Sequence, residues 1–332
     1  MSPSNALSLA WSQSRDHASL GPPRVVADHV LTLSDPGTLQ ATQLTTGEVV
    51  WTREVISVDS KARLGVQGEL VYFTDADGTL RSFNAETGEE QEPVSLGTLS
   101  SEVRFYGSLV ISVSQQGCIQ AQDRWRQRTR YELCEFPQPE IYLPGSMARV
   151  GSRGVAEFER GLFSWRLLDG ELDQVLPMDS GLTTGIAKSR GCAFFGTANG
   201  DLVKVYIDPL RVEAAVNTSG GIKHVPLVSR GHVVVLLGPE AHSQEIVSYD
   251  FRLQELWRQP PPPKGQWTST LASMGSALYA GDSEGAVHAL ELTSGDHRAS
   301  LFLEKDEITH VVMAGNFLLA TTRQGGLYCL NQ

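Results

Sequence analysis

The segment Ala41-Thr42-Gln43-Leu44-Thr45-Thr46-Gly47-Glu48-Val49-Val50-Trp51 decides the fold of this chain. It predicts a strand on each side of the Thr46-Gly47 turn, because Gly tolerates the positive φ that such a turn needs. The indole of Trp51, eight residues after Gln43, can pack between neighbouring sheets. Full enclosure of a tryptophan side chain is worth ~3 kcal/mol.

Weaker copies of this segment recur about every forty residues, a period typical of propellers and solenoids. Each copy follows a Gly or Asp, an apolar run and a hairpin turn that in most copies contains Gly. The runs are short and rich in β-branched and aromatic residues, which favours strands. Eight residues open these runs: Asp28, Gly68, Gly107, Gly154, Gly191, Gly231, Gly275 and Gly315. The sequence therefore predicts eight similar β-sheets.

The two ends of the chain fit one sheet. Residues 307–332 form a half-finished repeat, and Trp11 takes the place of Trp51 when the last residues are aligned with the first copy. We expect strand 6–12 to complete this sheet and close a ring, which also covers an edge that would template aggregation. The predicted fold is all-β, an eight-bladed β-propeller of four-stranded antiparallel blades, with residues 1–332 as one domain.

The repeat Ala-x-Gln-x-x-Thr-Gly-x-x-x-Trp resembles that of the quinoprotein-like (PQQ-like) β-propeller family, and size and blade number are similar to its BamB-type scaffold propellers. The resemblance covers essentially the whole chain and implies the fold, but such folds host many unrelated activities. Quinoprotein dehydrogenases hold their quinone on the axis with a stacked Trp, adjacent cysteines, calcium and a catalytic Asp. This chain has no adjacent cysteines, so we expect no cofactor and no dehydrogenase activity.

Composition limits the classes of partner. The net charge is −11, and we expect neither broad nucleic-acid binding nor binding to anionic membranes. No apolar span approaches the length of a membrane helix, so we expect no membrane insertion. The first residues show no basic or apolar signal region, which predicts a cytoplasmic location unless a precursor was trimmed.

Residues of the types used in catalysis and metal binding lack a suitable spacing in this sequence. The eight histidines show no zinc-type spacing to one another or to a cysteine, so we predict no metal site. The four cysteines show no paired spacing, and Cys192 and Cys329 are interpreted as small buried hydrophobes. Residues 281–285 match Gly-x-Ser-x-Gly but occupy a hairpin instead of a strand-to-helix elbow. We therefore predict no catalytic residues.

The propeller axis is one candidate binding site. The innermost strand precedes each apolar run, so residues five positions before the opening residues are expected at equivalent depths. Four of them can carry charge: Arg63, Glu102, Arg149 and His310. More charge than a dry core would accept can mark a pocket for a small anion or a peptide end. Equally, the channel can be water-filled with charges that pair with one another.

Two irregular segments are candidates for partner contacts. The stretch 124–130 is rich in arginine and stands where blade 3 should have its Thr-Gly turn, either as a solvated strand edge or as a patch for an acidic partner. Trp125 and Arg126 are its candidate contacts. Four consecutive prolines lengthen the link between blades 6 and 7, as a stiff connection or as a polyproline II arm that docks through Pro261 and Pro262.

These observations favour a non-catalytic scaffold or adaptor that binds protein partners within a larger assembly. The alternative is a small-molecule-binding or enzymatic propeller that uses a polar axial pocket. Propeller loops vary at little structural cost, so the partner is not encoded in a recognisable motif.

Overall fold

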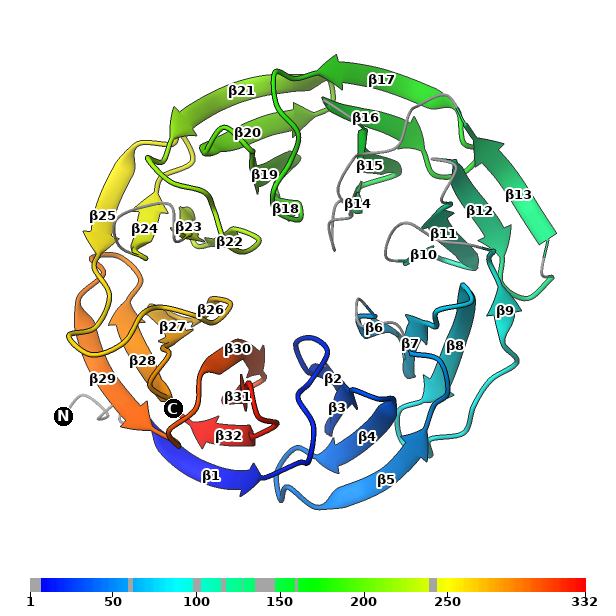
Figure 1. Cartoon of the computed structure of the whole chain (residues 1–332). Coiled ribbons are helices and arrows are strands. Elements are labelled where there is room, and N and C mark those ends of the chain that lie inside the picture. Colours follow the sequence, from blue (N-terminus) through cyan, green and yellow to red (C-terminus); the bar gives the residue numbers. More distant parts are fainter. Residues whose placement is uncertain are drawn as a thin grey trace.

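The computed structural model describes residues 7–58, 62–97, 103–114, 118–126, 128–134, 147–158, 161–238 and 244–332. These residues form eight four-stranded antiparallel sheets arranged as blades around a central axis (Figure 1). Along the chain, the strands of a blade run from the axis to the rim. The predicted eight-bladed propeller is confirmed. No described segment is a helix able to cross a membrane.

The first four blades follow the chain without a break in order. Blade 1 contains β2 (Arg24–Val26), β3 (His29–Ser34), β4 (Thr38–Gln43) and β5 (Val49–Glu54). Blade 2 contains β6 (Gly65–Gln67), β7 (Leu70–Thr74), β8 (Thr79–Asn84) and β9 (Val94–Ser95). Blade 3 contains β10 (Arg104–Tyr106), β11 (Leu109–Val113), β12 (Ile119–Asp123) and β13 (Arg128–Leu133). Blade 4 contains β14 (Met147–Val150), β15 (Arg153–Phe158), β16 (Gly161–Arg166) and β17 (Leu172–Pro177).

The next three blades have the same order, and the last blade takes its outer strand from the start of the chain. Blade 5 contains β18 (Ala187–Ser189), β19 (Cys192–Gly196), β20 (Asp201–Ile207) and β21 (Leu210–Asn217). Blade 6 contains β22 (Leu227–Ser229), β23 (His232–Leu236), β24 (Ile246–Tyr249) and β25 (Glu255–Gln259). Blade 7 contains β26 (Ala272–Met274), β27 (Ala277–Gly281), β28 (Ala286–Glu291) and β29 (His297–Phe302). Blade 8 contains β30 (Ile308–Ala314), β31 (Phe317–Thr322), β32 (Leu327–Asn331) and β1 (Ser8–Gln13).

The pairing of β1 with β32 closes the ring. Ser8 pairs with Asn331 and Trp11 with Cys329, and the register shifts between Leu9 and Trp11. The predicted closing strand is therefore confirmed, with observed bounds one or two residues further along the chain. Figure 1 shows β1 on the outer side of β32 in this blade.

The core lies between neighbouring blades, because each sheet is apolar on both faces. Leu31 and Leu39 of blade 1, for example, are fully buried in one cluster with Val71 and Phe83 of blade 2. The fully buried middle strands read as continuous apolar runs for this reason. Such packing leaves the inner strands, the rim and the loops as the surfaces on which a site can form.

Aromatic side chains on four outer strands join a blade to the next one, an arrangement we call the interblade latch. Trp51 donates a hydrogen bond from Nε1 to the carbonyl of Ala85 at 2.9 Å, and its ring lies against Gly88. Equivalent hydrogen bonds to the next blade are donated by three other side chains: Trp11 to blade 1, Trp257 to blade 7 and Tyr131 to blade 4. Their acceptors are the carbonyl oxygens of Leu44, Leu292 and Leu167, at 2.7, 2.9 and 3.2 Å. The indole predicted to pack between sheets is therefore also hydrogen-bonded there.

Candidate functional site

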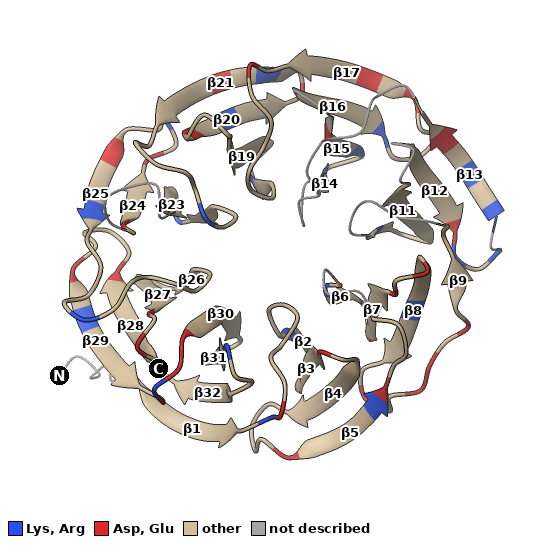
Figure 2. Ribbon diagram, in the orientation of Figure 1, with Lys and Arg blue, Asp and Glu red and all other residues tan. Residues whose placement is uncertain are grey.

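The inner strands give the axis a basic character. Four inner strands contain one basic residue each: Arg24, Arg104, Arg149 and Lys188. Figure 2 shows a basic residue on β2 and acidic residues just before β30, where Glu307 directly precedes the strand. None of the eight inner strands, all of which the structure describes, contains Asp or Glu. The inner strands themselves therefore contain only basic charged residues, although the chain as a whole has a net charge of −11.

His310 is held in its neutral form on inner strand β30. Its Nδ1 lies 3.1 Å from the hydroxyl of Thr309 and 3.2 Å from that of Thr321. Burial, and then the positive charges of His224, Arg63 and Arg24, lower the pKa of His310 to about 4. Arg63, which like His310 was predicted at the axis, thus lies close enough to lower the pKa of His310.

Arg63 is tied to neighbouring backbone. Its Nη1 donates to the carbonyl of Ala62 at 2.9 Å, and its side-chain stem packs so closely on Gly21 of blade 1 that a Cβ there would lie 2.5 Å from Cδ. The third predicted residue, Glu102, lies outside the described residues. The part of the axial prediction that the structure describes is therefore Arg63, Arg149 and His310.

Arg149 is not at the depth of the other two. Gly151, with φ of 61°, takes the turn position that the sequence analysis assigned to Gly154, and Gly154 lies within β15. Arg149 therefore lies two residues before the turn glycine, instead of five. Its Nε donates to the carbonyl of Gly151 at 2.9 Å, and its guanidinium lies 4.5 Å from the ring centroid of Tyr106. It does not join His310 in one cluster.

The eight inner strands, all within the described part of the chain, lack the groups that would hold a pyrroloquinoline quinone. That group, as the resemblance implies, needs a tryptophan to stack on and carboxylates for calcium, and the inner strands contain neither. The six tryptophans of the chain are elsewhere: five are buried within or between blades and Trp125 is on the rim. We therefore derive no step through a quinone.

The Gly-x-Ser-x-Gly pentad, residues 281–285, spans the end of β27 and the turn before β28, as predicted. Asp282 is buried and accepts a hydrogen bond or proton from His288, whose Nε2 lies 2.9 Å from Oδ2. The other ring nitrogen of His288 faces His297 at 3.4 Å, and the Ser283 hydroxyl accepts from the amide of Gln266. Both nitrogens of His288 are thus engaged by groups other than the serine that a hydrolase would need activated.

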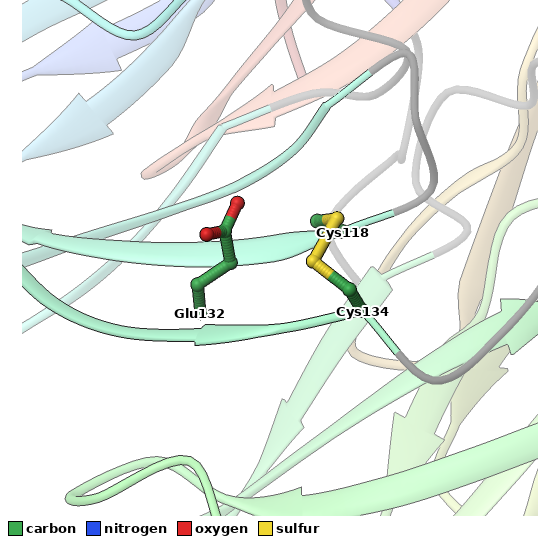
Figure 3. A group of neighbouring side chains, drawn as sticks. All are labelled: Cys118, Glu132 and Cys134. Atoms are coloured by element: carbon green, nitrogen blue, oxygen red, sulfur yellow. A yellow bond between two sulfur atoms is a disulfide. The ribbon is translucent and has the colours of Figure 1, made fainter.

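Cys118 and Cys134 form a disulfide, which the absence of paired spacing in the sequence did not predict. They meet because Ile119 pairs with Leu133, so the residues just outside this pair stand opposite each other on antiparallel strands. Figure 3 shows both sulfurs near the carboxylate of Glu132. Metals bind cysteine as the thiolate. Because Cys118 and Cys134 are joined in a disulfide, neither sulfur is available as a metal ligand beside Glu132. Cys192 and Cys329 are free and buried, as predicted.

Within the basic stretch predicted from sequence, residues 124–126 form a turn and residues 128–130 form the first half of β13. Trp125 is 73% exposed, and its indole centroid lies 5.0 Å from the guanidinium of Arg124, which is itself buried. The amides of Trp125 and Arg126 donate to Oδ1 of Asp123 at 3.0 and 3.1 Å. The structure thus places the predicted Trp125 and Arg126 together on the rim of blade 3.

The proline segment forms a surface connection. Pro261 and Pro262 are partly buried, and the carbonyl of Pro260 accepts a hydrogen bond from Nε1 of Trp267 at 3.0 Å. Trp267 is fully buried and lies edge-on to His288. This anchoring fits the stiff connection that was one of the two interpretations of the sequence.

A buried carboxyl in blade 4 was not recognised as a candidate. Glu157 is 8% exposed and accepts a hydrogen bond from the amide of Leu182 at 2.8 Å, and among the described residues none bonds to its Oε2. Burial raises the pKa of Glu157 to about 7. Its position within the apolar run 155–158 was the available signal, because a charged residue there interrupts a buried strand.

Comparisons with known proteins agree with this architecture. The sequence model of the family described as outer membrane protein assembly factor BamB matches residues 8–92 and 154–332. The part it leaves out, residues 93–153, contains blade 3 with its basic rim. No curated relative matches the chain significantly by sequence.

Solved structures with the same fold belong to proteins of different kinds. BamB from Moraxella catarrhalis superposes with a TM-score of 0.75 at 15% identity, covering 98% of each chain. The computationally designed Ika8 protein gives 0.74 at 16% identity, covering 96% of this chain and 98% of that one. Quinohemoprotein alcohol dehydrogenase from Comamonas testosteroni gives 0.77 at 13% identity, covering 98% and 76%. Identities this low carry the fold alone, but the family model spans most of the sequence, and the chain belongs to the BamB (outer membrane protein assembly factor) family of β-propellers.

Proposed function

We propose that this chain is a non-catalytic scaffold that holds protein partners in a larger assembly. Its family is described as an assembly factor, and its closed ring offers a rigid frame with variable loops. The observation that carries the proposal is Trp125, an indole left 73% exposed at the tip of a turn. Exposed tryptophan with neighbouring arginine is the composition of interface hot spots.

Reconstitution tests this proposal. The full-length protein, tagged and crosslinked in its native host at its normal level, should be captured with defined proteins. The purified candidates should then comigrate with it in size-exclusion chromatography at fixed stoichiometry. Failure of every purified candidate to form such a complex would remove the basis for a scaffold.

A ligand-binding propeller is the second candidate, favoured by Arg63 and Arg24, whose positive charges act on His310. In that case a small anion should raise the melting temperature of the protein, and Arg63→Ala should abolish the shift while partner capture stays intact. The bonds of Arg149 to Gly151 and of His310 to two threonines favour structural roles for these side chains. The scaffold proposal expects no such shift with small anions.

The cytoplasmic location expected from the sequence stays a proposal, and the disulfide supplies its test. Disulfides persist in oxidising compartments, whereas cytosolic thiols are kept reduced. Protein isolated from its host with rapid thiol trapping should therefore show free Cys118 and Cys134 if it works in the cytoplasm. An intact Cys118–Cys134 bond would place it in an oxidising compartment instead.

A further inference from the structure

The turn and outer strand of blade 3 differ in charge from the rest of the rim. Residues 124–130 contain four arginines and no acidic residue. In each of the other six blades whose third and outer strands are joined by a turn, the equivalent segment has at least as many acidic as basic residues. These segments are residues 44–50, 85–91, 167–173, 207–213, 251–256 and 292–298. The basic rim, as we call residues 124–130, is therefore a local exception.

Arg126, Arg128 and Arg130 line one hollow in the surface. Together with Asp123 and Thr129 they enclose about 200 Å³. All three arginines are exposed, so their guanidinium groups are accessible to an incoming carboxylate. Planar guanidinium groups bind carboxylates in paired hydrogen bonds, which makes arginine suited to this task.

Trp125 stands beside the hollow in a fixed position. The buried guanidinium of Arg124 lies between the indole of Trp125 and the ring of Phe105, 5.0 and 5.8 Å from the two centroids. The carboxylate of Asp123 fixes the turn through two backbone amides. An apolar anchor and three cations are thus presented side by side, and the fixed backbone of the turn lowers the ordering cost at binding.

β13 also offers a free edge for strand pairing. It pairs with β12 on one side, and among the described strands none pairs with its other edge. Figure 1 shows β13 at the outside of the ring. Tyr131 holds the strand in place, because its hydroxyl donates to the carbonyl of Leu167 in blade 4 and its ring lies against Gly170. An extended segment can add to such an edge by main-chain hydrogen bonds.

We propose that the basic rim binds an extended acidic segment of a partner protein, which pairs with the edge of β13. Carboxylates of the segment contact Arg126, Arg128 and Arg130, and an apolar side chain packs on Trp125. The inference rests on the scaffold function proposed above and adds the chemistry of the partner. Charge complementarity favours an acidic segment, because the basic rim is a local positive patch on a protein of net negative charge.

The charge of the neighbouring blades argues against nucleic acid as the occupant. The turn of blade 2 carries Glu86, Glu89 and Glu90, and that of blade 4 carries Asp169 and Glu171. A long polyanion that extends past the basic rim meets these carboxylates and is repelled. A short acidic protein segment ends before it reaches them.

Peptide titration tests the proposal on the full-length protein. The probe is a fluorescein-labelled ten-residue peptide of alternating Glu and Val, and its binding is measured by fluorescence polarisation. We expect saturable binding that weakens about tenfold or more in the triple variant Arg126→Glu/Arg128→Glu/Arg130→Glu. Binding should also weaken when salt is raised, because exposed charges are screened.

A matched variant and two further probes separate charge from the other features. Arg211→Glu/Arg252→Glu/Lys264→Glu changes the net charge equally at exposed positions of other blades and should leave binding within about twofold. A peptide of the same charge with proline at every third position should bind several-fold more weakly, since proline cannot pair with a strand edge. Circular dichroism and melting curves confirm that each variant is folded.

Three outcomes would overturn the proposal: equal binding by both triple variants, equal binding of the proline peptide, or tighter binding of a single-stranded oligonucleotide of the same charge. Its failure is distinct from failure of the scaffold function. If the rim variant still comigrates with a partner that the wild type binds, the proposed binding of an acidic segment is wrong, whereas the proposed scaffold function is retained. If no partner comigrates with the wild type, the scaffold fails whatever the peptide does.

Discussion

At the scale of single residues, close contacts between glycine and an aromatic ring fix how the blades meet. Gly88 has a φ of 68° and a Cβ there would lie 2.6 Å from Cδ2 of Trp51. The glycine is thus needed twice, for its backbone conformation and for the space that the indole occupies. Gly68 has a similar φ of 59° but open space around it. Comparing Gly68 with Gly88 therefore separates the effect of the positive φ from the effect of the space taken by the indole.

Replacing Gly68 and Gly88 with alanine should therefore cost different amounts. Gly68→Ala carries only the strain of positive φ, about 1 kcal/mol, whereas Gly88→Ala also displaces Trp51 and should cost about 3 kcal/mol. Urea denaturation of both variants measures the difference. Equal losses would mean that the interblade latch tolerates a methyl group and contributes little.

The second residue-scale prediction concerns Glu157. Its pKa is raised to about 7 in the folded protein by burial, so above pH 4.5 the unfolded chain loses its proton first. Stability from this residue therefore falls as pH rises from about 4.5 to 7. Glu157→Gln cannot ionise and should be more stable than the wild type at pH 8, by at most about 3 kcal/mol, and nearly equal at pH 4.

Denaturation at the two pH values, with the exposed Glu86→Gln as control, measures this effect. The control should change stability little at either pH, because Glu86 is exposed. A gain from Glu157→Gln that is the same at pH 4 and pH 8 would contradict the buried, protonated carboxyl.

At the scale of elements, β1 matters more than its short length suggests, because it is the outer strand of blade 8 and carries the latch to blade 1. Trp11 donates to the carbonyl of Leu44 and packs on Gly47. β1 thereby joins the two ends of the sequence, because it pairs with β32 at the other end of the chain. Its register with β32 can be tested directly.

A disulfide across this pair should form in one register and not in another. Ser8 and Asn331 are partners in the ladder, and the Asn331 Nδ2 and Ser8 Oγ atoms lie 3.5 Å apart. Ser8→Cys/Asn331→Cys should therefore form an intrachain bond on oxidation and stabilise the protein by up to about 5 kcal/mol, since the closed loop is very long. Thiol counting, intact mass and denaturation measure this.

Ser12→Cys/Asn331→Cys is the matched control, because Ser12 pairs with Tyr328 and stands too far from residue 331 for the bond. If the control pair crosslinks as readily as the partner pair, the register of the closing strand is wrong.

At the scale of the whole molecule, the sequence repeat predicts the fold. The features that could not be predicted lie in blades whose sequence differs from the repeat. The Thr-Gly turn and Trp51 recur often enough to count blades and place the closing strand. Tyr131 replaces tryptophan in the latch of blade 3, and the Cys118–Cys134 bond depends on the register of two strands. Neither follows from residue spacing along the chain.

The candidate site was predictable to a smaller extent. Composition alone located Trp125 and Arg126, because arginines replace the Thr-Gly turn there. Arg149 was misplaced since two glycines, Gly151 and Gly154, compete for one turn position in blade 4. His310 and Glu157 acquire their shifted pKa values from burial by distant segments, which a linear sequence does not display.

The central claim is that this propeller works by binding a protein on its rim, and not a ligand on its axis. Hydrogen exchange of the full-length protein, free and in complex with a partner that comigrates with it, tests this most directly. The account predicts slowed exchange in residues 123–133 of blade 3, with unchanged exchange in inner strands β2, β6 and β30. Protection confined to these inner strands, with none on the rim of blade 3, would contradict it.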